Sequence, residues 1–204
     1  MGLIIFLRRE KSVNRFRDTI LGAIQSGLGD EALICSGFFQ EDGKFSAAVT
    51  SKLANSLAAA NVRTDLVGVY NGVWIQRFRR FRDNLASEGV AVDAYTQRGL
   101  RWHAKVFILK KAGSPILGIV GSSNLTRPAF HNDSPFNRET DVVMWPDTAV
   151  GMGNTASTVL AANNDPYSYI VADYDPRRNA GLTILDRLIQ LEKDVRRSAL
   201  SKLD

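Results

Sequence analysis

The chain has 204 residues, a formal net charge of +5 at pH 7 and an isoelectric point near 9.5. Hydrophobic residues make up 45% and charged residues 23%, which supports a folded core and excludes a disordered chain. The positive charge favours an anionic partner, nucleic acid ahead of acidic lipid. A single cysteine, Cys35, excludes a disulfide framework and a cysteine-based metal site, and its apolar surroundings predict a buried thiol.

The opening stretch "MGLIIFLRR" has too few apolar residues for a secretory signal and is predicted to be a strand. No other apolar run approaches the ~18 residues that a membrane-spanning helix requires. We therefore expect a cytoplasmic protein with no membrane partner. Because no repeat, low-complexity tract or linker divides the chain, we expect one catalytic domain over residues 1–204, either complete or part of a longer enzyme.

Apolar runs alternate with amphipathic segments along the chain, as they do in α/β domains. Strands are predicted at residues 3–7, 32–39, 65–71, 90–96, 103–110, 116–123 and 140–146. Helices are predicted at residues 13–27, 46–60, 74–88 and 181–200. The stretch 147–180 contains Pro166 and Pro176 and is predicted to be irregular, so its "GMGNTA" segment is interpreted as a loop. The expected fold is a mixed, largely parallel β-sheet flanked by helices.

The predicted helix 74–88 has an apolar face and a basic remainder. The apolar side chains of Trp74, Phe78, Phe81 and Leu85 recur at steps of four, three and four residues. Four arginines fall largely off that face: Arg77, Arg79, Arg80 and Arg82. They predict either a footprint for a phosphate backbone or a solvated basic surface, and the sequence leaves both interpretations open.

The segment "HAKVFILKKAGSPILGIVGSSNLT", residues 103–126, predicts a β-hairpin. The two-residue period of a strand places His103 and Lys105 on one face and Lys110 on the other. In the returning strand, Ser122 and Asn124 share a face. Glu139 in "NRETDVV" precedes the next strand. These polar side chains are therefore predicted to gather at one end of the sheet.

This set of side chains suits phosphodiester chemistry. A neutral imidazole at His103 can attack phosphorus, and a second proton donor must protonate the leaving oxygen. Lys105, Ser122 and Asn124 would donate to non-bridging oxygens, whose charge grows in the transition state. Glu139 would accept a hydrogen bond from the other nitrogen of His103 and stabilise the imidazolium. No metal or cofactor is required by this scheme.

The order "HAK", "GSSN" and "NRE" resembles the phospholipase D superfamily, whose signature is HxKxxxxD with a downstream GSxN and a glutamate. The resemblance covers residues 103–139 and implies a nucleophile at His103, phosphate binding by Lys105, Ser122 and Asn124, and a supporting acid at Glu139. One residue departs from the pattern, because the aspartate of the family falls on Lys110. By strand parity this position faces away from His103, so the change bears on local structure more than on chemistry.

The resemblance further implies an activity and an assembly. Small members with a single motif are typically nucleases that dimerise, and such domains also resemble the nuclease part of certain restriction enzymes. We expect a metal-independent DNA endonuclease with a phosphohistidine intermediate, DNA being favoured over RNA. The alternatives are a lipid phosphodiesterase or phosphatidyl transferase, and a catalytically silent module that binds DNA or assists assembly.

The chain has only two histidines, whereas the mechanism asks for a nucleophile and an acid. Either His131 in the loop "FHNDSPF" completes the site, or a second copy of His103 does. The second possibility is favoured, since two-motif members of the superfamily place their motifs around a pseudo-twofold axis, which a homodimer would restore. The apolar positions of the hairpin and the final helix are expected to form the interface.

Overall fold

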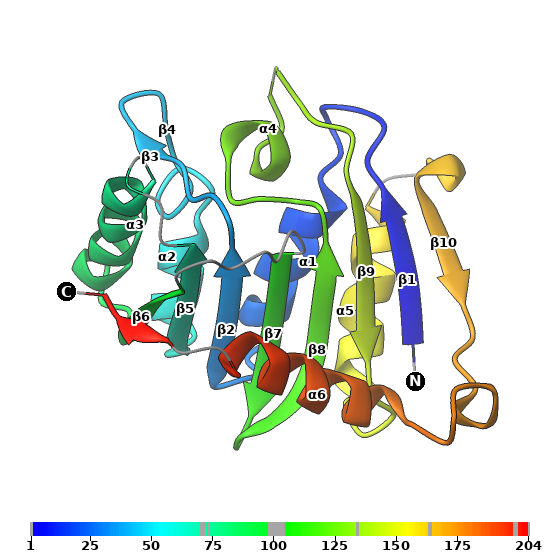
Figure 1. Ribbon diagram of the computed structural model, residues 1–204. Helices are drawn as coiled ribbons and strands as arrows, with labels where there is room; N and C mark the ends of the chain where they lie inside the picture. Colours follow the sequence, from blue (N-terminus) through cyan, green and yellow to red (C-terminus); the bar gives the residue numbers. More distant parts are fainter. Residues whose placement is uncertain are drawn as a thin grey trace.

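The computed structural model describes residues 2–69, 72, 74–97, 105–133, 135–162, 165–197 and 200–203. In chain order the strands are β1 (Gly2–Leu7), β2 (Glu31–Ser36), β3 (Glu41–Asp42), β4 (Phe45–Ser46), β5 (Arg63–Val69), β6 (Val92–Gln97), β7 (Lys105–Lys111), β8 (Ser114–Gly121), β9 (Thr140–Trp145), β10 (Tyr169–Ala172) and β11 (Ser201–Lys202). In this part of the chain, nine strands form one sheet in the order β10-β1-β9-β8-β7-β2-β5-β6-β11, and β3 and β4 form a separate hairpin (Figure 1).

Helices cover both faces of the sheet (Figure 1). The longer helices are α1 (Arg15–Gln25), α2 (Leu53–Ala59), α3 (Ile75–Ser87), α5 (Val150–Ala161) and α6 (Ile184–Arg196). The first four pack on one face around the larger core, whereas α6 crosses the opposite face. Short turns of helix occur at α4 (Arg127–Phe130), η1 (Pro166–Ser168) and η2 (Pro176–Arg178). No helix in the described ranges has the length and apolar content that a membrane span requires.

The central strand β7 shows how the sequence builds the two cores. Phe107 and Leu109 belong to the larger core, whereas Val106 and Ile108 belong to the cluster under α6. The alternation confirms the predicted two-residue period of this strand. Cys35 lies in the cluster under α6, where burial raises the pKa of its thiol to about 12, as expected of an unreactive core cysteine.

The mixed sheet between helices confirms the expected α/β class, but the expectation of largely parallel pairing is wrong. Among the described strands, parallel pairing joins only β2 to β5 and β5 to β6. The other neighbours are antiparallel, and β1 pairs with β9 and β10 from the far end of the chain. As a result, the ends of β1, β2 and β8 and the beginnings of β7 and β9 lie at the same edge of the sheet (Figure 1).

The predicted irregular stretch 147–180 contains helix α5 and strand β10, so that expectation and the interpretation of "GMGNTA" as a loop are wrong. Glycine is unfavourable in a helix interior, so the two glycines of "GMGNTA" argued against a helix. Packing overrides this preference, because Met152, Ala156 and Val159 are buried in the larger core. Helix α1 comes close to α5, since a Cβ atom on Gly22 would lie 3.4 Å from Cγ2 of Thr155.

Candidate active site

The predicted polar residues emerge at the shared edge of the sheet. Lys105 begins β7, Ser122 and Asn124 follow β8, and Glu139 directly precedes β9. Paired strands hold them in register, because Lys105 lies opposite Gly121, and Gly121 lies opposite Asp141. His103 lies outside the described residues. The structure therefore places four of the five predicted catalytic residues at one edge.

Glu139 is held by hydrogen bonds on both of its carboxylate oxygens. The Ser122 hydroxyl donates to Oε2, and the Asn137 side-chain amide donates to Oε1 at 3.0 Å. The Thr140 backbone N–H in turn donates to the Ser122 hydroxyl oxygen at 3.0 Å. These bonds fix both the serine and the carboxylate. In this arrangement the Ser122 proton is directed to Glu139.

Gly121 is required by a close approach of two strands. A Cβ atom there would lie 2.1 Å from Oδ1 of Asp141 and 2.5 Å from the backbone oxygen of Thr140. Real side chains do not come so close, so only glycine lets the Asp141 carboxylate lie over β8. Since Lys105 occupies the same cross-strand row, the carboxylate leans towards the strand that carries the lysine.

Asp141 holds the second serine of "GSSN" from the interior of the protein. Its side chain is only 2% exposed, and it accepts from the Ser123 hydroxyl at 2.6 Å and from the Ser123 backbone N–H at 3.2 Å. Ser122 and Ser123 thus face opposite ways, one towards Glu139 and one into the protein. The turn that carries Ser122 and Asn124 is consequently fixed from both sides.

Burial perturbs the two charged groups of this row. Burial raises the pKa of Asp141 to about 6, although the bonds from Ser123 oppose the shift. Burial likewise lowers the pKa of Lys105, against the opposing charges of Glu139 and Asp141. Ionisable groups with such shifts are enriched at functional sites, because active sites depend on tuned acids and bases.

Asn124 connects the site to the segment that follows β2. The Ser36 hydroxyl has one proton, which is shared between the backbone oxygen of Phe38 at 3.0 Å and the side-chain oxygen of Asn124 at 3.4 Å. A parallel bridge then joins Phe39 to Leu125. The chain at residues 38–40 therefore runs beside the "GSSN" turn.

His131 belongs to a different neighbourhood. Its ring lies edge-on to Phe45 of β4 at 5.5 Å between centroids, and burial followed by the charge of Arg17 lowers the pKa of its imidazole. Arg8 fixes the backbone of this loop, because its guanidinium donates to the carbonyl oxygens of Pro128, Ala129 and His131. The imidazole of His131 is thus directed to the β3–β4 hairpin and α1.

The four arginines of α3 have different surroundings. Arg77 lies over the Trp74 ring at 4.6 Å and forms an ion pair with Asp42 at 3.6 Å. Arg82 donates to the backbone oxygen of Leu203 at 2.9 Å, which ties it to the end of the chain. Arg79 is partly exposed and Arg80 is exposed. Arg77, in the first turn of α3, and Arg82, in its middle, therefore have different neighbours.

Lys110, at the position of the family aspartate, points to the face covered by α6. Its ammonium group lies 3.2 Å from Glu31 and 3.1 Å from Glu192, and these two partners raise its pKa despite burial. The lysine thus joins β7 to β2 and α6. This contact gives the departure from the family motif a structural role.

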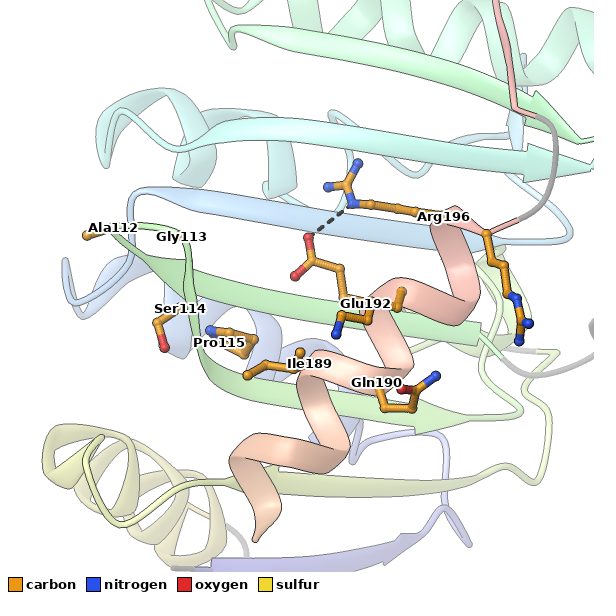
Figure 2. Close-up of a pocket in the computed structure, with 10 residues that line it drawn as sticks. Ala112, Gly113, Ser114, Pro115, Ile189, Gln190, Glu192 and Arg196 are labelled. Carbon is orange, nitrogen blue, oxygen red and sulfur yellow. Dashed lines mark hydrogen bonds and ion pairs between the residues drawn. The ribbon is translucent and has the colours of Figure 1, made fainter. Parts of the chain in front are cut away.

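A groove against α6 lies away from these residues. The groove has a volume of about 1080 Å³ and lies between the β7–β8 turn and α6 (Figure 2). Glu192 pairs with Arg196 there at 3.0 Å. The turn lies at the opposite end of the hairpin from Lys105 and Ser122. Within the described residues, no group of three or more histidine, cysteine, aspartate and glutamate side chains is arranged to hold a metal ion.

Sequence reasoning missed Ser123, Asn137 and Asp141 as members of this site. Asn137 stands in the quoted "NRE" but was given no role, and Ser123 stands in "GSSN". Asp141 carried a usable signal, because the strand alternation places it on the core-facing side with Val143. A carboxylate at such a position is uncommon and marks a buried polar contact.

Three comparisons relate the chain to known proteins. The family described as the NgoFVII restriction endonuclease N-terminal PLD domain matches residues 18–163, and no curated protein matches the chain. Phosphatidylserine synthase of Haemophilus influenzae Rd KW20 is a similar solved structure, with 11% identity and a TM-score of 0.51. The match covers 95% of this chain and 46% of the synthase, so the chain spans less than half of that protein.

NucT from Helicobacter pylori is also similar, with 15% identity and a TM-score of 0.44 over 78% of this chain and 93% of NucT. The synthase supports the fold alone. The family match, by contrast, extends over well more than half of the sequence and includes the whole of the predicted site. The chain therefore belongs to the NgoFVII restriction endonuclease N-terminal PLD domain family.

Proposed function

We propose that this domain is a phosphodiester hydrolase that cleaves DNA as an endonuclease through a covalent intermediate on His103. Membership of a restriction endonuclease PLD domain family supports the reaction class. The observation that carries the proposal is the arrangement at the sheet edge, where Glu139 is fixed by Ser122 and Asn137 beside the strand that bears Lys105. The net charge of +5 agrees with a polyanionic substrate.

The proposed reaction has two displacements at phosphorus. A ring nitrogen of His103 forms a bond to phosphorus, the bond to the leaving oxygen breaks, and a second histidine protonates that oxygen. Water then attacks the phosphohistidine, gives its proton to the second histidine, and releases His103. In this scheme Lys105 and the Asn124 amide donate to the non-bridging oxygens.

Glu139 and Ser122 act together in this proposal. The carboxylate accepts a hydrogen bond from His103 and so stabilises the imidazolium that leaves phosphorus. The hydroxyl of Ser122 keeps the carboxylate in place, which is the role that its contact in the structure supports. The second histidine is proposed to be His103 of the partner subunit, since the contacts of His131 are with Phe45 and the α1 side.

The proposal is tested by cleavage of supercoiled plasmid in parallel with single-stranded DNA, RNA and phosphatidylcholine, all with excess EDTA. We expect DNA cleavage to persist, because acid, base and electrophile are all assigned to side chains. Loss of cleavage in EDTA with rescue by magnesium would overturn the mechanism. Cleavage of phosphatidylcholine alone would identify a lipid phosphodiesterase instead.

A single variant separates an enzyme from a silent binding module. His103→Ala should bind DNA with the affinity of the wild type and lose cleavage, because the nucleophile is removed while the basic surface remains. A wild-type protein that binds DNA without cleaving any of the four substrates would favour the silent module.

A further inference from the structure

We propose that Phe38 and Trp74 form a stacking platform that holds an unpaired nucleobase next to the phosphate bound at Asn124. The inference rests on the proposed nuclease function and adds to it a substrate class, namely nucleic acid with an unstacked base at the cleavage site. The supporting observations are the exposure of Phe38, its edge-to-face contact with the partly buried Trp74, the location of Phe38 beside the "GSSN" turn, and the cation that accompanies the two rings.

The platform consists of two aromatic side chains and one arginine. The rings of Phe38 and Trp74 meet edge to face, with centroids 4.8 Å apart and an interplanar angle of 64°. The guanidinium of Arg77 lies 4.6 Å from the centroid of the Trp74 ring. Aromatic rings accompanied by a basic side chain are the usual means of holding single-stranded nucleic acid, because every base offers a π-face and every nucleotide a negative charge.

The outward direction of Phe38 is fixed by its neighbour. Phe39 is 2% exposed and packs against Phe78 and Phe81, with centroids 4.6 and 4.7 Å away. In an extended segment the preceding side chain points the other way, and Phe38 is accordingly 39% exposed. The buried ring holds the backbone, and the exposed ring remains accessible to a ligand.

The platform is coupled to the proposed phosphate site through one hydroxyl. The one hydroxyl proton of Ser36 is shared between the Phe38 backbone oxygen at 3.0 Å and the Asn124 side-chain oxygen at 3.4 Å, so both sides of the subsite contact the same residue. The bridge between Phe39 and Leu125 keeps the two segments in register. A base stacked on Phe38 would therefore belong to a nucleotide adjoining the phosphate at Asn124.

The test measures binding of a fluorescent single-stranded oligonucleotide in the full chain carrying His103→Ala, so that cleavage does not interfere. On this background Phe38→Leu should weaken binding on the order of ten-fold, because it removes the ring but keeps an apolar side chain. Phe38→Tyr should retain the affinity. Tyr167→Leu is the matched control, since Tyr167 is 74% exposed and also lies under an arginine, but beside β10, which four strands separate from β2.

Substrate variants identify the ligand group. An oligonucleotide with abasic positions around the bound phosphate should bind proteins with Phe38 and with Phe38→Leu equally tightly. A blunt duplex should likewise bind both proteins with the same affinity. Parallel titrations with DNA and RNA strands show whether the sugar matters to a base that is recognised by its π-face. Trp74→Leu should act in the same direction as Phe38→Leu, and circular dichroism confirms that each variant is folded.

Equal affinity of Phe38→Leu, Trp74→Leu and the reference protein for single strands would overturn the platform. So would an equal loss in the Tyr167→Leu control. These outcomes are distinct from failure of the proposed function, which the cleavage assay of the otherwise wild-type protein reports. DNA cleavage with indifferent platform variants removes the platform alone.

Discussion

Asp141 shows how one residue can weaken the fold at the place where the site is built. Its carboxylate is buried, and its pKa of about 6 lies above the value of 3.8 for an unperturbed aspartate. An ionised group at neutral pH is therefore held at a cost in stability. Carboxylates of this kind are more often kept for function than for folding. Asp141 accepts two hydrogen bonds from Ser123 and so fixes the turn before Asn124, which is its structural role in the site.

We expect the stability of the wild type to fall as pH rises from about 4 to about 6, because the folded state binds more protons than the unfolded state in that window. A shift from 3.8 to about 6 corresponds to at most about 3 kcal/mol. Asp141→Asn should show a smaller decrease, with the remainder due to Glu41, whose pKa is also raised by burial. Urea unfolding at a series of pH values measures it, with the exposed Asp83→Asn as control, and parallel curves for Asp141→Asn and the wild type would contradict it.

The sequence predicted the residues that chemistry requires more readily than those that position them. Lys105, Asn124 and Glu139 stand in a recognisable order, whereas the contact of Asp141 with Ser123 depends on which strands become neighbours. The contact forms because β8 pairs with β9. Spacing along the chain does not determine the register of this pair, because three-dimensional packing fixes which residues lie opposite each other.

At the scale of elements, local patterns predicted strands and amphipathic helices but not their partners. The β7–β8 hairpin and α3 follow from alternation and from a four-three-four spacing. Local patterns do not predict which strands are neighbours or whether they run parallel or antiparallel. For example, β1 pairs antiparallel with strands from the far end of the chain. Helix α5 was missed for another reason. Its glycines have low helix propensity, and the helix is stabilised by its packing against α1, which the sequence does not show.

Lys110 offers a test of how β7 is joined to α6. Lys110→Asp, which restores the family residue, would place three carboxylates together and should lower the free energy of unfolding by about 3–5 kcal/mol. Lys110→Met should cost less, because it adds no charge. Combining Lys110→Asp with Glu192→Lys should recover part of the loss. Chemical denaturation measures all three variants, and a fully stable Lys110→Asp protein would refute the contact.

At the scale of the whole molecule, the expected dimer interface needs revision. Most apolar side chains of the β7–β8 hairpin are buried within the protomer, in the cluster under α6 on one face and in the larger core on the other, while Ile116 and Val120 are partly buried. The expectation that they form the interface is therefore wrong.

The composite site remains testable without knowledge of its interface. We expect light scattering to report a dimer, and His131→Ala to cleave DNA almost normally. Mixing wild-type and His103→Ala subunits in equal amounts should leave about a quarter of the dimers with two intact histidines, and activity should follow that fraction. A fully active monomer would contradict the composite site, as would a folded but inactive His131→Ala protein.

The position of β1 between β9 and β10 has a consequence for how the chain reaches its native state. Leu7 lies opposite Thr140, and Ile5 lies opposite both Val142 and Ile170. During synthesis the first strand therefore emerges long before either of its neighbours exists. Contacts between such distant parts of a chain are slow to form, because the intervening loop must be closed first. The pairing of β1 with β9 and β10 is thus expected to be among the last parts of the sheet to assemble, after the β8–β9 register that holds Asp141 over Gly121, whose strands are close in sequence.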